Sequence, residues 1–241
     1  MKKKRIVLID AHALIHRAYH ALPGFASSKG EPTGALYGLS TMIMRAIEEL
    51  QPFTIFACFD LPKPTFRHVA YDAYKGTRQK SDDELISQLI RAKDVFDAFT
   101  IERFELEGFE ADDLIGTLVE KLKKEKDVEI IIVSGDMDTM QLIEGEKVKV
   151  YTLKKGIQET QMYDEKKVIG RYSFTPKQIP DYKGLAGDPS DNIPGIKGIG
   201  EKTATELLNH FGTIEKMYTV LKKDRQQFLE KGVKERVVKL L

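Results

Sequence analysis

Three short apolar runs, each ending at an aspartate, limit what this chain can fold into more than any other feature of the sequence. The runs are Arg5–Asp10, Thr54–Asp60 and Val128–Asp136. Their length and almost unbroken apolar character are typical of parallel strands that are buried on both faces. The carboxyl ends of such strands border the ligand crevice of an open α/β sheet, so we expect the terminal acids to lie there.

Acidic side chains recur at the ends of hydrophobic runs or just past turns, and this placement predicts a metal site. Acids gathered at one place repel each other unless cations bind between them. Oxygen ligands without a set of His or Cys favour Mg²⁺ or Mn²⁺ over zinc. The nine candidate ligands are Asp10, Asp60, Glu110, Asp112, Asp113, Asp136, Asp138, Asp188 and Asp191.

Size and composition are those of a globular protein. With 241 residues, 41% of them hydrophobic, the chain is long enough to bury a sizeable core in one large or two small domains. The single cysteine, Cys58, lies inside a predicted strand, so we expect no disulfide framework and a cytoplasmic location. The apolar run after the basic start is too short for a signal peptide, and no stretch has transmembrane length, so we expect neither export nor a membrane anchor.

The net charge of +1 gives no argument for a nucleic-acid partner, but the distribution of charge does. If metals neutralise the strand-end acids, the remaining surface is basic in two segments. Arg67, Lys75 and Arg78 mark the first segment, and Lys197 and Lys202 mark the second. A basic rim around a metal-filled depression suits a phosphodiester substrate.

The order of elements predicts an α/β fold with a mostly parallel twisted sheet flanked by helices. Helical spacing runs from Gly34 to Leu50, and Pro52 ends it before the second strand. A further amphipathic helix is expected from Ser81, which has capping-box character with Glu84.

The last third of the chain changes character. Short extended pieces broken at Gly156 are followed by a short helix over 164–172. From Thr175 onward the pattern is one of helices and tight glycine turns. We therefore expect an α/β core over 1–174 and a helical subdomain over 175–241.

Residues 62–80, referred to below as the arm, have two prolines, little apolar periodicity and interleaved aromatic and basic side chains. A solvated surface loop explains such a segment. The alternative is an arm over the crevice that grips a flexible strand through phosphate charge and aromatic stacking. We favour the second interpretation, because the segment directly follows Asp60, and we place a helical arch or clamp at about 62–92.

Two acidic motifs have structural as well as chemical explanations. Glu110, Asp112 and Asp113 open a helix, where capping and the helix dipole favour one or two acids without any metal. Asp136 and Asp138 follow a strongly apolar strand, and alternate carboxylates there can converge on one ion. The same Asp-x-Asp pattern occurs in haloacid-dehalogenase-like phosphatases, although Met140 stands where that motif has Thr or Val.

The segment from Gly184 to Ala204 contains Gly198-Ile199-Gly200 directly before a predicted helix. Glycines at such a position leave backbone N–H groups open to a phosphate at a helix N-terminus. This is the signature of a helix-hairpin-helix element, which binds duplex backbone without reading bases.

With these motifs in this order, the chain resembles the 5′ nuclease domains of bacterial DNA polymerases I, within the wider flap endonuclease family. The resemblance runs from Arg5 to about Phe228 and implies a PIN-like nuclease core with a helix-hairpin-helix subdomain. It implies structure-specific 5′-3′ exonuclease and 5′-flap endonuclease activity on DNA in replication and repair. It also implies a polymerase domain as a partner, in the same or a separate chain, and a nucleoid-associated location; we expect a monomer.

Carried onto matching positions, the resemblance implies that a first divalent ion is held by Asp10, Asp60, Glu110 and Asp112. A second ion would be held by Asp136, Asp138 and Asp191, with Asp113 and Asp188 shared or in the outer sphere. Mg²⁺ is the expected ion, Mn²⁺ its expected substitute, and related hairpins also hold K⁺. Lys75 and Arg78 match basic residues that contact the scissile phosphate. The expected DNA contacts are Arg17, Arg67, Lys75, Arg78, Lys197, Gly198, Ile199, Gly200, Lys202 and Thr203.

The expected chemistry is two-metal hydrolysis that leaves a 5′ phosphate. Lys75 and Arg78 would stabilise the charge that develops on the phosphorus centre. Two alternatives remain at this stage: a junction-binding module that has lost catalysis, and a small-molecule phosphatase.

Overall fold

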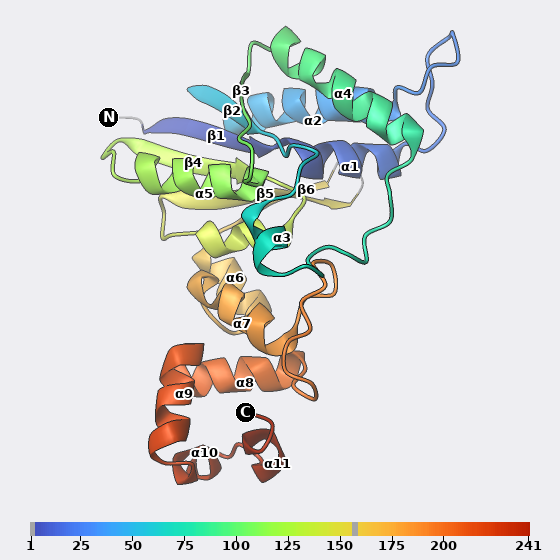
Figure 1. Cartoon of the computed structure of the whole chain (residues 1–241). Helices are drawn as coiled ribbons and strands as arrows, with labels where there is room; N and C mark the ends of the chain where they lie inside the picture. Colours follow the sequence, from blue (N-terminus) through green and yellow to red (C-terminus); the bar gives the residue numbers. More distant parts are fainter. Residues whose placement is uncertain (1–2, 156–158) are drawn as a thin grey trace. The chain divides into compact units, whose positions relative to one another are not determined.

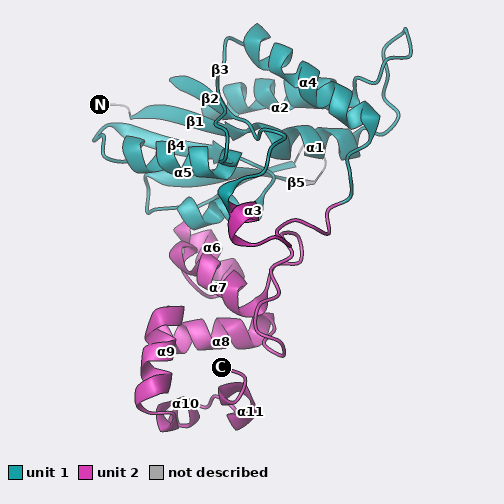
Figure 2. Ribbon diagram, in the orientation of Figure 1, with its two compact units in different colours: residues 1–66, 79–164 teal, residues 67–78, 165–241 magenta. Residues whose placement is uncertain are grey.

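The computed structural model describes residues 3–155 and 159–241, and the chain divides into two compact units (Figure 2). Unit 1 comprises Met1–Phe66 and Gln79–Asp164, and unit 2 comprises Arg67–Arg78 and Glu165–Leu241. Residues 67–78, which we call the base of the arm, therefore belong to the same unit as the C-terminal helices. The domain boundary expected after residue 174 stays a prediction, and Gly156 lies outside the described residues.

Unit 1 is built on one sheet. Within the described residues its strands follow the order β3-β2-β1-β4-β5-β6, and all neighbours are parallel except the antiparallel pair β5 and β6. This confirms the mostly parallel sheet that the apolar runs predict. The strands are β1 (Lys4–Asp10), β2 (Thr54–Cys58), β3 (Glu102–Phe104), β4 (Val128–Val133), β5 (Val148–Lys155) and β6 (Glu159–Tyr163).

Helices cover both faces of the sheet (Figure 1). On one face α1 (Ala11–Ala21), α2 (Gly34–Leu50) and α4 (Asp83–Ala98) pack together over a core that includes Val7 and Ile9 of β1. On the other, α5 (Ala111–Leu122) contacts β1, β2 and β4. Strand side chains alternate between faces, so strands covered on both sides must be apolar throughout.

One glycine brings two of these helices close together. A Cβ at Gly38 of α2 would lie 2.7 Å from the Cβ of Ala18 of α1, well inside normal contact. Both positions are fully buried or nearly so. The absence of a side chain at Gly38 and the small side chain of Ala18 therefore set how closely α1 and α2 approach.

The strand order places a topological switch point beside β1. The chain proceeds from β1 to β2 and β3 on one side, and then continues with β4 and β5 on the other. In doubly wound sheets, ligands bind at the carboxyl ends of the strands at such a point. Asp10 ends β1 there, and Asp136 follows β4.

Unit 2 is helical, and in its described residues no strand is present. The arm enters it at Arg67, within α3 (Phe66–Ala70), and residues 71–82 contain turns but no helix or strand. The predicted helical subdomain is confirmed. Its elements are α6 (Glu165–Tyr172), η2 (Pro176–Gln178), α7 (Ile179–Ala186), α8 (Glu201–Phe211), α9 (Ile214–Lys223), α10 (Gln226–Glu230) and α11 (Glu235–Val238).

The structure differs from the prediction in two details, an additional strand and the start of one helix. β3 was not predicted, because it has only three residues at the edge of the sheet and none of them is buried. The helix expected from Ser81 begins at Asp83, with Asp82 as its N-cap.

In the described part of the chain, no helix is both long and apolar enough to cross a membrane.

Candidate active site

Asp10 is the most buried acid at the carboxyl edge of the sheet, with 5% of its surface exposed. Its Oδ1 accepts a hydrogen bond from the backbone N–H of Ala13 at 3.0 Å and caps α1. Burial raises the pKa of Asp10 to about 6, and the charges of Asp60 and Asp136 act in the same direction. Those charges act only over short range, so these three carboxylates are neighbours.

Ser134 links two of the acids. Its hydroxyl donates to Oδ2 of Asp10 at 2.7 Å, and its oxygen accepts the N–H of Asp136 at 2.9 Å. The side chain is fully buried. Sequence reasoning missed this residue; the available signal was a small polar residue at the end of an otherwise apolar strand.

Asp112 lies in the same electrostatic cluster. Burial raises its pKa well above the usual range, and repulsion from Asp10, Asp136, Asp60 and Asp138 raises it further. The structure thus brings together five of the predicted ligands, all from unit 1, at the switch point of the sheet. A cluster of this composition offers hard oxygen ligands, and a divalent cation bound there would relieve the repulsion.

Asp60 is fixed by two neighbours. Its Oδ1 accepts the N–H of Ala111 at 2.8 Å, which ties the end of β2 to the start of α5. Its own N–H donates to Nδ1 of His12 at 3.2 Å. Burial lowers the pKa of His12, so the ring is neutral and serves as an acceptor rather than as a counter-ion for Asp60.

The acids at the start of α5 divide into two roles. The carboxylate of Asp113 accepts the N–H of Glu110 at 2.9 Å and so closes the first turn of the helix. Glu110 is the N-cap and is buried. The capping explanation that the sequence allowed therefore applies to Asp113, while Asp112 points into the acidic cluster.

Asp136 follows β4 as the N-cap of the 3₁₀ helix η1 (Met137–Leu142), and Asp138 lies in the first turn of that helix. Oδ1 of Asp136 accepts the N–H of Asp138 at 2.9 Å, which sets the turn between them. Both contribute to the charge that acts on Asp112. Their positions agree with the alternate carboxylates that the motif predicts.

Asp10 makes the stability of the protein depend on pH. Its pKa in the folded state is raised to about 6 from 3.8, so its contribution to stability is lost as pH rises between these values. In cation-free buffer, Asp10→Asn should gain stability relative to the unsubstituted protein between pH 4 and 6, by at most ~3 kcal/mol. Urea unfolding at a series of pH values measures this difference; a gap that is the same at every pH would contradict the assignment.

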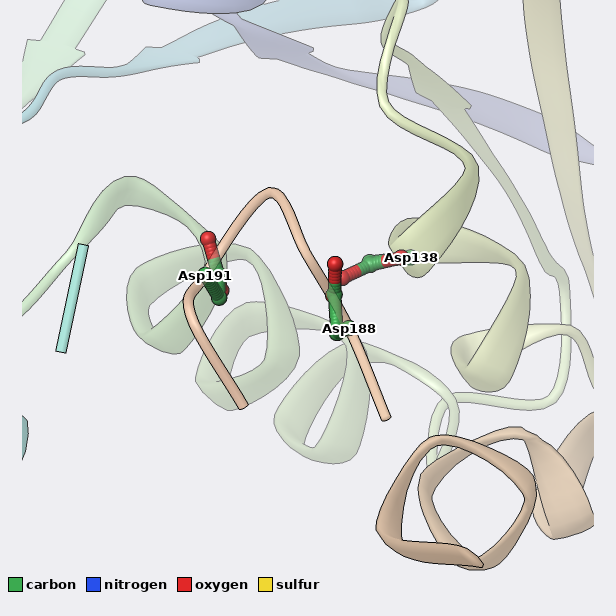
Figure 3. Close-up of side chains that lie close together, drawn as sticks. All are labelled: Asp138, Asp188 and Asp191. Carbon is green, nitrogen blue, oxygen red and sulfur yellow. The ribbon is translucent and has the colours of Figure 1, made fainter. Parts of the chain in front are cut away.

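Asp188 and Asp191 lie in unit 2, on the loop between α7 and α8 (Figure 3). Burial raises the pKa of Asp188, but hydrogen bonds from Lys183 and Ser190 outweigh burial and leave this pKa below its usual value. The Lys183 ammonium lies 2.6 Å from Oδ2 of Asp188. Asp188 is therefore already neutralised by a residue of its own unit.

Asp191 accepts hydrogen bonds on both carboxylate oxygens. The guanidinium of Arg78 lies 2.7 Å from Oδ1, and the hydroxyl of Tyr74 lies 3.1 Å from Oδ2. These donors come from the base of the arm, which belongs to the same unit. The predicted phosphate contact Arg78 and the predicted ligand Asp191 are thus brought together as an ion pair.

Lys75 has an unusual backbone. Its φ of 54° lies in the left-handed region, which costs a residue of this type about 1–3 kcal/mol. Its N–H donates to the carbonyl of Asp191 at 3.0 Å, and its ammonium lies 5.0 Å from the ring centre of Tyr74. The arm base is therefore attached to the loop after α7 by both backbone and side chains.

The glycine hairpin before α8 is only partly what the sequence predicts. Gly198 has a φ of +92° and needs to be glycine for that reason. Gly200 is the N-cap of α8 with an ordinary φ of −101°, and open space surrounds the position of a Cβ. Glycine is among the residues preferred at an N-cap, and the open space leaves room for a side chain there.

Ile199 lies between the two glycines and is buried. Its side chain is 3% exposed and its N–H donates to the carbonyl of Ile196 at 2.9 Å. The side chain and the N–H thus have partners within the fold, and a contact of Ile199 with DNA stays a prediction. Lys197 and Lys202 are exposed and Thr203 is half-buried on the same segment.

The other two predicted DNA contacts lie elsewhere. Arg17 on α1 donates to the carbonyl of Leu153 on β5 at 3.1 Å and so has a structural contact within unit 1. Arg67 lies on α3. Their contacts with DNA stay predictions.

The sheet is open and mostly parallel, and acids are crowded at its switch point. Together with a helical unit that contains a hairpin, this arrangement defines the class of metal-dependent enzymes that act on phosphate esters. Family models match nearly the whole chain. The 5′-3′ exonuclease N-terminal resolvase-like domain matches residues 5–173, and the 5′-3′ exonuclease C-terminal SAM fold matches residues 174–240. The chain belongs to the 5′-3′ exonuclease family.

Relatives agree with this assignment. The chain is 43% identical over 216 residues to DNA polymerase I of Bacillus subtilis, covering 90% of this chain and 24% of that protein. It is 35% identical over 232 residues to the thermostable DNA polymerase I of Thermus thermophilus, covering 96% of this chain and 27% of that protein. The chain thus spans about a quarter of the length of these relatives.

Solved structures share the fold. T5 5′-exonuclease with bound divalent metal ions (zinc) superposes with a TM-score of 0.74 at 22% identity, covering 98% of this chain and 87% of that one. A T5 flap endonuclease complex with DNA and metal ions gives 0.72 at 20% identity, with 98% and 86% covered. The family assignment supports a nuclease over both a small-molecule phosphatase and a module without catalysis.

Proposed function

We propose that this chain is a structure-specific 5′ nuclease that hydrolyses phosphodiester bonds of DNA carrying a free 5′ strand, as a 5′-3′ exonuclease and 5′-flap endonuclease. The observation that supports this most is the cluster of five mutually repelling carboxylates at the switch point of the sheet. Such a cluster is costly to the fold by itself, and it suits a site for divalent cations.

In this proposal Asp10, Asp60, Asp112, Asp136 and Asp138 hold two Mg²⁺ ions, with Mn²⁺ as a substitute and Glu110 contributing beside them. Such ions would supply a water of lowered pKa and would stabilise the leaving oxygen. The chain keeps the carboxylates in place: Ser134 orients Asp10, the start of α5 orients Asp60, and the turn of η1 orients Asp138. Asp113, Asp188 and Asp191 would bind an ion either directly or through a water molecule.

Lys75 and Arg78 would act on the substrate rather than on the ions. Each is a basic side chain at the base of the arm, where it would stabilise charge on the scissile phosphate. Arg78 is held by Asp191 in a charge-assisted hydrogen bond, so its guanidinium is oriented before DNA arrives.

The hairpin would bind the phosphate backbone of the duplex, with K⁺ as an additional ligand there. Gly200→Val tests this without straining the fold, because open space surrounds a Cβ at that position. We expect affinity for duplex DNA to fall about tenfold, since a side chain at a helix N-terminus blocks a phosphate, while the melting temperature falls by only a few degrees, because valine caps a helix less well than glycine. Fluorescence anisotropy with labelled duplex measures the affinity; unchanged binding would remove the hairpin from the proposal.

The proposed activity is tested with three substrates: a 5′-flap duplex, a blunt hairpin without a flap, and p-nitrophenyl phosphate. Cleavage of the flap only when Mg²⁺ is present is the expected result. Binding of the flap without cleavage in Mg²⁺ and in Mn²⁺ would contradict the nuclease. Release of nitrophenol at a comparable rate would instead favour a small-molecule phosphatase.

A further inference from the structure

We propose that Asn192 is a positioning residue for Lys75, acting through the carbonyl of Ala73. The inference rests on the proposed function, in which Lys75 contacts the scissile phosphate. All three residues belong to unit 2. We call residues 73–76 the lysine turn, because they carry Lys75 at its third position.

The lysine turn places Lys75 in a conformation that a lysine rarely adopts alone. Its φ is 54°, in the left-handed region that side chains with a Cβ generally avoid. Such a conformation persists only where surrounding contacts impose it. One contact closes the turn itself: the N–H of Gly76 donates to the carbonyl of Ala73 at 3.0 Å.

Asn192 contacts the same carbonyl. Its Nδ2 donates to the carbonyl oxygen of Ala73 at 2.7 Å, so that this oxygen accepts one donor from within the turn and one from across the loop. A carbonyl held by two donors cannot rotate without losing both. The side chain of Asn192 therefore fixes the peptide from which the turn to Lys75 begins.

Asparagine suits this position for a second reason. Asn192 itself has a φ of 58°, and asparagine is among the few residues enriched in the left-handed region. Its backbone N–H donates to the carbonyl of Pro189 at 3.3 Å, which keeps the residue within its own loop. The position thus uses both the backbone tolerance of asparagine and its amide.

Other contacts attach the arm base to this loop without touching the lysine turn's closing carbonyl. The hydroxyl of Tyr71 donates to the carbonyl of Asn192 at 3.2 Å, and Nε of Arg78 donates to the carbonyl of Ser190 at 3.2 Å. Both contacts survive loss of the Asn192 side chain. Removing the amide should therefore displace Lys75 locally rather than detach the arm.

Asn192→Gly removes the amide and keeps a residue that adopts a positive φ without strain. We expect kcat on a 5′-flap substrate to fall about tenfold, because a small misplacement of a catalytic group is costly. The KM for DNA should change less than about twofold, since the charge of Lys75 remains near the substrate. Asn192→Asp, which keeps the shape and loses the donor, should behave in the same way.

A second measurement is independent of activity. The N–H of Lys75 donates to the carbonyl of Asp191, so its hydrogen exchange reports whether the lysine turn is in place. In Asn192→Gly this exchange should quicken about tenfold. Gln51→Gly is the matched control, because Gln51 also has a left-handed φ, 47°, but lies in unit 1; both kcat and Lys75 exchange should stay unchanged in it.

Combining the variants shows whether Asn192 acts through Lys75. In a Lys75→Ala background, Asn192→Gly should cause no further loss of turnover, since residues acting as one unit are not additive. The inference is overturned if Asn192→Gly lowers kcat by a further tenfold in the Lys75→Ala background. It is also overturned if Asn192→Gly alone changes neither kcat nor the hydrogen exchange of Lys75. If Lys75→Ala itself keeps full turnover, the proposed role of Lys75 fails instead, and the exchange measurement still decides whether Asn192 holds the turn.

Discussion

Replacing Asp112 by asparagine is expected to abolish Mg²⁺-dependent cleavage of a 5′-flap substrate, with a loss on the order of a thousandfold or more. Asp112 lies within reach of the charges of Asp10, Asp60, Asp136 and Asp138, so a cation that those acids bind is expected to require its carboxylate as well. Single-turnover kinetics at saturating enzyme would separate this loss from weaker DNA binding.

The same substitution should make the protein more stable in cation-free buffer at pH 8. Burial, together with the neighbouring acids, raises the pKa of Asp112 in the folded state. A carboxyl with a raised folded-state pKa destabilises the fold at any pH above that value, because ionisation is easier in the unfolded chain. Asparagine cannot ionise, so Asp112→Asn should raise the melting temperature, and added Mg²⁺ should stabilise the variant less than the unsubstituted protein.

Asp94→Asn provides the control for the change in net charge. Asp94 is an exposed acid on α4 of the same unit, and its substitution should alter neither cleavage nor the melting temperature in cation-free buffer. Retained cleavage in Asp112→Asn, or a melting temperature below that of the unsubstituted protein, would show that Asp112 is an ordinary helix-capping acid.

Lys75→Ala is expected to lower turnover of bound flap by about a hundredfold, since removing one group that stabilises transition-state charge typically costs this much. Duplex affinity should change less than about threefold, because many other phosphate contacts supply binding. The ammonium of Lys75 lies against the ring of Tyr74, so the side chain has a defined direction that alanine cannot reproduce.

The matched control is Lys121→Ala, which removes the same charge from an exposed position in the last turn of α5. It should leave both turnover and affinity unchanged. Equal losses of turnover and affinity in Lys75→Ala would assign the lysine to binding alone, and a similar result for Lys121→Ala would indicate a general effect of charge.

The sheet was predictable where burial dictates residue type. β1, β2 and β4 are central strands, and apolar side chains on both faces made them recognisable in the sequence. β3 was not, because an edge strand of three residues has no period long enough to detect. The acids that follow the central strands were predictable for the same reason, because the apolar runs that predict these strands also show where each strand ends.

The roles within the site were less predictable than its members. Asp113 and Asp112 are adjacent, and only the structure distinguishes the acid that caps the helix from the one that joins the cluster. Ser134 depends on a partner 124 residues away, and the pair Arg78–Asp191 joins residues 113 apart. Long-range pairs of this kind leave no mark on local periodicity.

The assignment of residues 67–78 to the same compact unit as 165–241 has a consequence for synthesis on the ribosome. Tyr74 precedes its acceptor Asp191 by 117 residues, and at elongation rates of about 5–20 residues per second that separation is a wait of roughly 6 to 23 s. During this interval Tyr74 and Arg78 have been made, but the loop residue Asp191 that accepts their hydrogen bonds has not. The contacts that join residues 67–78 to the rest of their unit therefore form only after the ribosome has made the loop between α7 and α8.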